Sequence, residues 1–319
     1  MADIVQAERL TKIYKLGMFA KRKVQALDEF SFSIKEGEVF GLIGPNGAGK
    51  STAIKILLNL IQPTQGHATL FGIDVKDKRA RTDVGFVPEN PAPQEYLSAE
   101  EYVQLQAILA GRSSRDARVL ASKALDTVEL GPLRKVIIRR YSKGMTQRAM
   151  LAGAIVANPK LLILDEPTSG LDPVGRRLVR DLMLQQRKAG VTILFCTHII
   201  SDVEALCDRV ALLAKGKVVR SGPIVDIVNA EGAIVEVICE GSSVDAVTAL
   251  LADFKATVEP SAHLLLVRLP EEHLQIAIRK LLEETIKIRR IQPHRFGLED
   301  AFISVVQASE TDTVGGVLQ

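Results

Sequence analysis

One short stretch of the chain has the residue types needed to hold a phosphate group. Residues 44–52 read GPNGAGKST and match the pattern G-x4-G-K-[ST]. Glycines let a backbone turn tightly, so that several N–H groups point at phosphate oxygens from the start of a helix. In such a loop the lysine reaches the outer phosphates and the hydroxyl next to it binds Mg²⁺. The predicted phosphate-binding residues are Gly44, Pro45, Asn46, Gly47, Ala48, Gly49, Lys50, Ser51 and Thr52, with Ser51 also a metal ligand.

Two adjacent carboxylates follow an apolar run further along the chain. The run Leu161–Leu164 is typical of a buried strand, and Asp165 and Glu166 come directly after it. A carboxylate at a strand end suits Mg²⁺, so Asp165 is predicted to bind the metal directly or through water. Glu166 could polarise the attacking water as a general base. Alone, this motif could equally be a strand followed by a solvated acidic turn. With the phosphate loop upstream, it predicts an ATPase or GTPase.

A second loop has the form of an anion site. Residues 141–145 read YSKGM and stand at the start of a predicted helix over residues 146–157. Free N–H groups at a helix N-terminus attract anions, although a serine N-cap on any helix would look similar. Two phosphate-directed loops in one chain make sense if two chains pair and each completes the site of the other.

The elements expected to position these residues alternate between short β-branched runs and longer helical patterns over roughly the first 225 residues. This alternation predicts an α/β domain with buried strands in a sheet covered by helices. Between about residues 95 and 156 only helical spacing occurs, with Gly111 and Gly131 as expected helix ends, which predicts an inserted helical subdomain. The candidate strands are Val39–Ile43, Ala68–Phe71, Val84–Val87, Leu161–Leu164, Val191–Cys196 and Val210–Leu213.

The pattern changes after Pro223. It predicts a first domain over residues 1–230 and a small α+β domain over residues 231–307, with a βαββαβ order and a boundary near residues 229–232. Residues 308–319 are polar and predict a frayed tail. The small domain could be a dimerisation or packing module, or a sensor of a small molecule. Truncation at about residue 231 would separate the two alternatives.

Composition narrows the class of protein. The 41 basic and 38 acidic residues leave a net charge of +3, and aromatic residues are scarce, so no nucleic-acid partner is expected. The three cysteines are far apart, which favours buried thiols over a disulfide framework or a zinc site. No apolar run approaches the ~18 residues of a membrane span, and the N-terminus lacks a signal peptide. We therefore expect a soluble protein whose membrane role, if it has one, comes through a partner.

The order of these motifs, over roughly residues 4–223, resembles that of the ATP-binding-cassette (ABC) family. YSKGM stands at the position of the family's signature loop, and LILDEPTSGLDP contains a Walker B strand and a D-loop. The resemblance implies an α/β fold of the P-loop NTPase type, with a RecA-like mixed-sheet core. It implies that His198 contacts the γ-phosphate as the switch histidine and that Tyr14 stacks on adenine. It also implies nucleotide contacts from Ser142, Lys143, Gly144 and Asp172.

Two positions depart from the family pattern. Glu89 stands where the family generally has a glutamine that senses Mg²⁺ and couples to the membrane subunit. Its carboxylate can still offer an oxygen to the metal, although its charge differs. Lys143 replaces a glycine of the signature loop, and a lysine near a phosphate is electrostatically compatible with the site. The segment Lys15–Lys23 is also longer and more basic than usual. It is interpreted as a solvated loop, with a position near lipid headgroups or the permease as the alternative.

The resemblance extends to a subgroup. VGFVPEN, YSKGM and the late FGLEDAF are similar to ATPase subunits of multidrug- or polysaccharide-type exporters. This implies a subunit that binds and hydrolyses ATP with Mg²⁺ and powers export through a separate permease. It implies a partner ATPase subunit, either a second copy or a homologue, in an ATP-sandwich dimer. The expected location is cytoplasmic, at the inner face of the membrane. A cassette ATPase acting on nucleic acid or ribosomes is the rival, disfavoured by the near-neutral charge and the single cassette.

Overall fold

The computed structural model describes residues 3–16, 22–90, 92–229, 234–261, 263–294 and 297–303. The chain divides into two compact units, the first running to Ile224 and the second from Val225 to Ile303. Each unit is described by itself. The predicted tail, residues 308–319, and the predicted boundary at 230/231 lie outside the described residues. The predicted domain limits therefore remain predictions.

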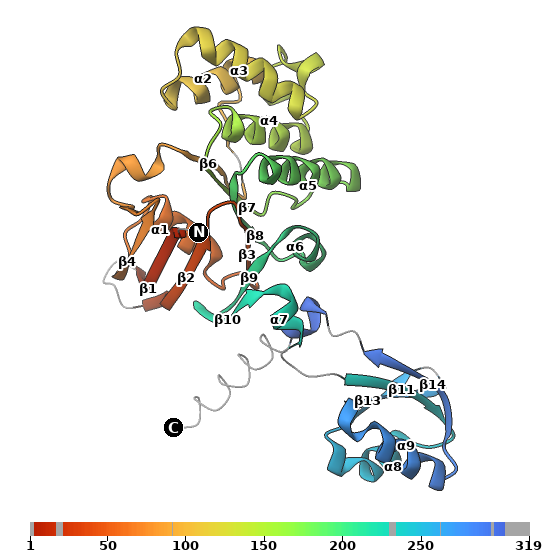
Figure 1. Ribbon diagram of the computed structural model, residues 1–319. Helices are drawn as coiled ribbons and strands as arrows, with labels where there is room; N and C mark the ends of the chain where they lie inside the picture. Colours follow the sequence, from red (N-terminus) through yellow and green to blue (C-terminus); the bar gives the residue numbers. More distant parts are fainter. Residues whose placement is uncertain are drawn as a thin grey trace. The chain divides into compact units, whose positions relative to one another are not determined.

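A six-stranded sheet forms the centre of the first unit (Figure 1). Its strand order is β10-β9-β3-β8-β7-β6, and all neighbours are parallel except β10, which pairs antiparallel with β9. Strands β3, β7 and β8 contain almost only apolar residues and are fully buried, as expected of strands covered on both faces. The strands are β3 Val39–Ile43, β6 Val84–Val87, β7 Leu161–Asp165, β8 Thr192–Thr197, β9 Arg209–Ala214 and β10 Lys217–Pro223.

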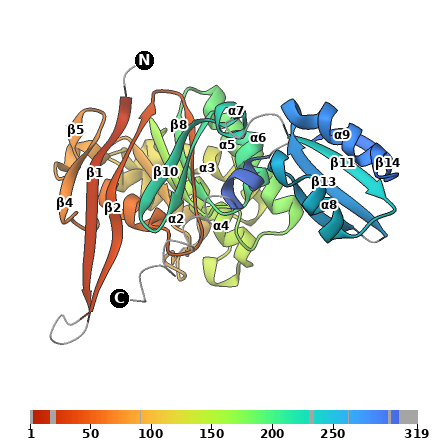
Figure 2. The same ribbon diagram turned by 90° about the horizontal axis from the view of Figure 1, so that it is seen from below.

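An antiparallel sheet in order β2-β1-β4-β5 packs beside the central sheet (Figure 2). Its strands are β1 Asp3–Leu16, β2 Arg22–Lys35, β4 Gln65–Leu70 and β5 Ile73–Asp74. The prediction that Ala68–Phe71 belongs to the buried sheet was wrong, because β4 pairs with β1 and β5. Residues 65–67 of β4 are exposed, and only Ala68 and Leu70 are buried. One face of β4 meets the core, which is the pattern of an antiparallel strand with one covered face.

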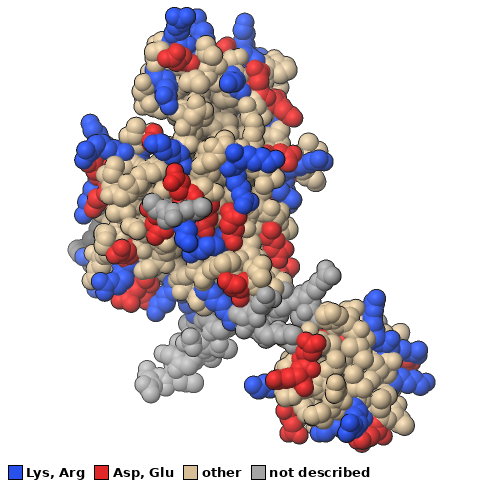
Figure 3. Space-filling view, viewed as in Figure 1, with Lys and Arg blue, Asp and Glu red and all other residues tan. Residues whose placement is uncertain are grey.

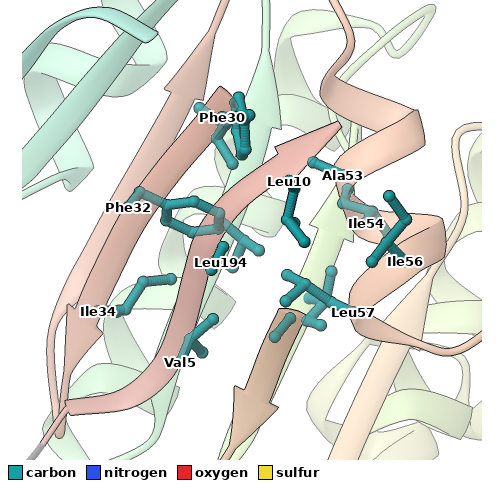
Figure 4. Packing of buried hydrophobic residues seen from close by; sticks show 14 of the residues in the cluster. Val5, Leu10, Phe30, Phe32, Ile34, Ala53, Ile54, Ile56, Leu57 and Leu194 are labelled. Atoms are coloured by element: carbon teal, nitrogen blue, oxygen red, sulfur yellow. The ribbon is translucent and has the colours of Figure 1, made fainter. Parts of the chain in front are cut away.

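The two sheets share one apolar core with helix α1, Lys50–Leu57 (Figure 4). Phe30, Phe32 and Ile34 of β2 point toward this helix, together with Val5 and Leu10 of β1. The central sheet adds alternate residues of its strands, such as Phe40 and Leu42 of β3. The residue between them, Gly41, faces helix α6, Ile200–Leu206, on the opposite side of the sheet. Alternation along β3 therefore places α1 on one face and α6 on the other.

The predicted helical insertion consists of α2 Ala99–Leu109, α3 Ser114–Thr127 and α4 Lys143–Ile155, which pack against one another. Helix α2 begins with a capping box, in which the Ser98 hydroxyl accepts from Glu101 N and Glu101 accepts from Ser98 N. Gly111 lies just beyond α2 with a φ of 84°. Gly131 does not end α3 as predicted, because the left-handed residue after that helix is Glu129, with a φ of 57°. Helix α5, Pro173–Lys188, follows the insertion and contacts β8.

The second unit is an antiparallel sheet in order β12-β13-β11-β14, with two helices on one face. The alternation is clear along β11, where Val235, Val237 and Cys239 are buried and the residues between them are partly exposed. The order strand–helix–strand–strand–helix–strand agrees with the prediction. The elements are α7 Ile224–Asn229, β11 Ile234–Glu240, α8 Val244–Leu250, β12 Thr257–Ser261, β13 Leu264–Pro270, α9 Leu274–Glu283 and β14 Lys287–His294.

Candidate nucleotide-binding site

The phosphate-binding loop connects β3 to α1 at the carboxyl edge of the parallel strands, where ligands bind in folds of this type. Gly49 has a φ of 110°, and a Cβ there would lie 2.7 Å from the carbonyl oxygen of Ala26. Only glycine fits both the backbone angle and this close approach. The Lys50 ammonium donates to the carbonyl oxygens of Gly44, at 2.6 Å, and Pro45, at 3.4 Å. These two contacts place the ammonium group of Lys50 against the first residues of the phosphate-binding loop.

Asp165 lies at the end of β7, two strands away from the phosphate-binding loop. It is 5% exposed, and its Oδ1 accepts no hydrogen bond from the described residues. Burial raises the pKa of Asp165, and the negative charges of Glu89 and Glu166 raise it further. A hydrogen bond from Ser51 and the charge of Lys50 act in the opposite direction. An orphaned oxygen on a buried carboxylate, beside a hydroxyl and a second acid, is a donor set that fits Mg²⁺.

Glu166 joins the phosphate-binding loop to the histidine after β8. Its Oε1 lies 3.6 Å from the Lys50 ammonium, and its Oε2 lies 2.9 Å from His198 Nδ1. The Thr197 hydroxyl donates to the same Oε2 at 3.4 Å. Glu166 is 6% exposed, whereas the His198 side chain is 51% exposed. The carboxylate is thus buried and held from two sides, while the imidazole remains open to a ligand.

Many of the predicted nucleotide residues line one cavity of about 430 Å³, whereas Gly44, Asp165 and His198 are not among its lining residues. The loop residues from Pro45 to Thr52 form its floor, and Glu89, Glu166 and Tyr14 complete the wall. Tyr14 lies on β1, where the Lys12 ammonium is 5.3 Å from its ring centroid. Three residues of β2 that were not predicted from the sequence, Val24, Gln25 and Ala26, also line the cavity. The apolar residues Phe30, Phe32 and Ile34 occupy every second position, which is typical of a strand and could have predicted β2. Residues 24–26 lie toward the other end of this strand.

Ser142, Lys143 and Gly144 do not line this cavity. They line a second one of about 340 Å³, together with Asp172. Ser142 is the N-cap of α4, its hydroxyl accepting from Met145 N at 3.3 Å, and Asp172 caps α5 by accepting from Gly175 N at 2.8 Å. The Lys143 side chain lies over Gly170, where an added Cβ would be 2.3 Å from the ammonium nitrogen. The predicted residues that line a cavity therefore fall into two separate groups on one chain.

Comparison with known proteins identifies the family. The family model for ABC transporters matches residues 27–169. An ABC transporter ATP-binding protein of Synechocystis is 40% identical over 255 residues, which cover 79% of this chain and 72% of the relative. The chain belongs to the family of ABC transporter ATP-binding proteins. The doxorubicin resistance ATP-binding protein DrrA of Mycobacterium tuberculosis is 31% identical, with 96% of this chain and 93% of the relative covered.

A solved structure agrees with this assignment. An ATP-binding cassette, described as a dimer in a post-hydrolysis state with bound ADP and Pi, matches with a TM-score of 0.63 and 28% identity. The match covers 69% of this chain and 98% of the cassette. The predicted fold class is confirmed, as is the prediction that the chain is an ABC ATPase that binds ATP. Within the described part of this ABC subunit, no helix is long and apolar enough to cross a bilayer.

Proposed function

We propose that this ABC ATPase powers export through a separate permease, from a position at the inner face of the membrane. Relatives that include the doxorubicin resistance protein DrrA of M. tuberculosis support the exporter assignment. The face of the protein seen in Figure 3 supports a partner other than nucleic acid, because acidic and basic side chains are interspersed on it.

The proposed catalytic roles follow from the first cavity and from two residues beside it, His198 and Asp165. Lys50 binds the outer phosphates of ATP, and Glu166 Oε2 accepts the proton of the attacking water. His198 contacts the γ-phosphate through its exposed imidazole, and Tyr14 supports the adenine. Mg²⁺ would be held by Ser51 and by Asp165 beside it, with Glu89 also close to Asp165, and would neutralise phosphate charge.

We also propose that two ATPase subunits pair to form the complete sites, and the separation of the two cavities supports this. Among the described residues, none lines both the cavity of the phosphate-binding loop and the cavity of the signature loop. Two subunits that pair about a two-fold axis would place each signature loop over the phosphate-binding loop of the partner. Ser142, Gly144 and Asp172 then act on the nucleotide of the other subunit. The partner is a second copy or a homologous ATPase.

A pair of substitutions at Gly144 tests this arrangement. A Cβ at this position would meet only Leu171 Cδ2, at an ordinary 3.7 Å, so both alanine and aspartate fit. Gly144→Asp puts a carboxylate in the first turn of α4, where it favours the helix but repels a phosphate. With a non-hydrolysable ATP analogue, the parent and Gly144→Ala are expected to double in mass, while Gly144→Asp binds the nucleotide and stays monomeric. Light scattering and a fluorescent analogue measure the two properties. A dimer of Gly144→Asp as stable as that of the parent would contradict the proposal.

A groove beside the helical insertion is the proposed docking site for the permease. A cavity of about 680 Å³ lies among β6, α2 and α4, lined by Gly85, Tyr102, Gln106 and Leu109 among others. Leu109 is 72% exposed and offers an apolar contact at the edge of this cavity. Glu89 lies two residues after the end of β6 and lines the nucleotide cavity. A movement of β6 caused by a docked permease segment could therefore displace Glu89 at the nucleotide. Leu109→Asp should release the chain from membranes that contain its permease without a change in basal ATP hydrolysis.

A further inference from the structure

A fully buried carboxylate outside the nucleotide cavity connects three segments of the first unit. Asp202, in the first turn of α6, is 0% exposed. Its Oδ2 accepts a hydrogen bond from the Thr168 hydroxyl at 2.8 Å. Its Oδ1 lies 2.9 Å from Nε of Arg180, an ion pair whose two atoms do not meet the geometry of a hydrogen bond. Burying a carboxylate costs several kcal/mol unless it is paired, so these two contacts are what permits Asp202 to be there.

The three residues belong to segments with different proposed tasks. Thr168 follows Glu166 by two positions and begins the turn into the D-loop, where Leu171 N donates to its carbonyl oxygen at 3.3 Å. Arg180 lies on α5, the helix that the D-loop residue Asp172 caps. Asp202 follows His198 by four positions. One carboxylate therefore joins the segment after the catalytic acid, the helix after the D-loop and the segment after the histidine.

The first turn of α6 has no capping side chain, although the buried Val203 and Leu206 pack the helix against its neighbours. The helix spans seven residues, and its N-cap, Ile199, makes no side-chain cap. Ile199 N donates to the Thr197 hydroxyl at 3.0 Å, and Asp202 N donates to Ile199 O at 3.2 Å. Both of these bonds are local to the segment that carries His198. The side chain of Asp202 adds polar contacts to other elements, Thr168 and Arg180 of α5, and these contacts help to fix this segment relative to Glu166.

We propose that Asp202, through Thr168 and Arg180, is a positioning residue for ATP hydrolysis, holding His198 at Glu166 and linking both to the D-loop. This inference rests on the proposed roles of Glu166 and His198. A displacement of the imidazole by about 1 Å is expected to cost on the order of a hundredfold in rate. When a partner subunit contacts the D-loop, a shift of Thr168 moves its bond to Asp202, and α6 moves the histidine with it.

Substitutions at Thr168 test the proposal with little change in shape. Thr168→Val removes the hydroxyl that donates to Asp202, whereas Thr168→Ser keeps it. Thr192→Val is the matched control. Thr192 is also a threonine with 0% exposure, and its hydroxyl accepts from Gly37 N at 2.8 Å at the opposite end of β8. Each valine variant loses one hydrogen bond, and Thr168→Val is expected to lose more stability because its partner is a buried carboxylate. The comparison therefore rests on kcat and not on stability.

The expected result is a difference in kcat. Thr168→Val should hydrolyse ATP roughly 10- to 100-fold more slowly, with the Kd for ATP within about threefold of the parent. Thr168→Ser and Thr192→Val should retain the parental kcat. Asp202→Asn should behave as Thr168→Val does; if it fails to fold, the threonine series still decides. Equal kcat for Thr168→Val and Thr192→Val would overturn the proposal.

A second measurement separates this inference from the proposed function. In a His198→Ala background, Thr168→Val should cause no further loss of kcat, because its effect acts through the imidazole. An additive loss would overturn the positioning role. If His198→Ala itself hydrolyses ATP at the parental rate, the proposed role of the histidine is wrong, and the present inference is rejected with it. If His198→Ala is slow but Thr168→Val is not, only the present inference is rejected.

Discussion

Replacement of Glu166 by glutamine tests the chemistry of the site most directly. The substitution keeps the volume of the side chain but removes the carboxylate that lies 2.9 Å from His198 and 3.6 Å from Lys50. A glutamine amide cannot accept a proton from water. Loss of a general base lowers a rate by about 10² to 10⁴-fold. This loss corresponds to about 3–5 kcal/mol in the free energy of activation.

The stability of the same variant should change little. Lys50 keeps its bonds to the Gly44 and Pro45 carbonyl oxygens, so loss of its partner at 3.6 Å leaves it paired. Removing the charge of Glu166 also removes its repulsion of Asp165, one of the causes that raise the pKa of that residue. The two changes in charge act in opposite directions. We expect a shift in Tm within about 3 °C, or about 1 kcal/mol for a unit of this size.

Release of inorganic phosphate measures the rate, and a fluorescent ATP analogue measures binding, which should be retained. Glu38→Gln is the control. Glu38 is a buried acid, 3.2 Å from Arg209, and it also accepts from Lys35 N at 2.8 Å just before β3, away from the nucleotide cavity. The control should lose stability and keep its rate, which is the reverse of Glu166→Gln. If Glu166→Gln releases phosphate at the parental rate, the assignment of the base is refuted.

Two further predictions concern the metal site and the helical insertion. Because burial is the first cause that raises the pKa of Asp165, folding favours its protonated form. Its ionisation therefore costs stability as pH rises from about 4 toward neutrality. In EDTA, the Tm of Asp165→Asn should fall less than the Tm of the parent over this pH range. Addition of Mg²⁺ and ATP should raise the Tm of the parent but not that of the variant. A Cβ at Gly85 of β6 would lie 2.3 Å from the carbonyl oxygen of Ala154 in α4. Gly85→Ala should lose about 1–3 kcal/mol in urea unfolding, and it should weaken analogue-induced dimers more than nucleotide binding.

The sequence was most informative where a strand, a loop and a helix are contiguous. The run Val39–Ile43, the phosphate-binding loop and the helix after it could be predicted together, because the strand is buried on both faces and the loop pattern is rare. Asp165, Glu166 and His198 could be placed at strand ends for the same reason. The distances between these side chains could not be predicted, because the relative positions of parallel strands depend on how the connecting helices pack.

The antiparallel elements were harder to predict. Strands β1 and β2 are each fourteen residues long, but the pairing between them shifts register several times. Each shift interrupts the alternation that identifies a strand with one covered face. Strand β10 was missed because it has no buried residue, while the Ala68–Phe71 segment was placed in the wrong sheet. Thr168 and Asp202 are 34 residues apart in the sequence and lie on different elements, so their contact depends on how those elements pack.

The backbone of Glu166 shows why the site lies where it does. Its φ of 50° is in the left-handed region, which costs a residue with a side chain of order 1–3 kcal/mol. The surrounding chain enforces this conformation, since Glu166 N donates to Cys196 O at 2.8 Å and its own carbonyl oxygen accepts from Ser169 N at 3.1 Å. The strained turn directs the carboxylate toward Lys50 and His198 instead of along the strand. If strain were the only factor, replacing Glu166 with glycine would stabilise the protein. Glycine has no carboxylate, however, so it could not act as a base between Lys50 and His198.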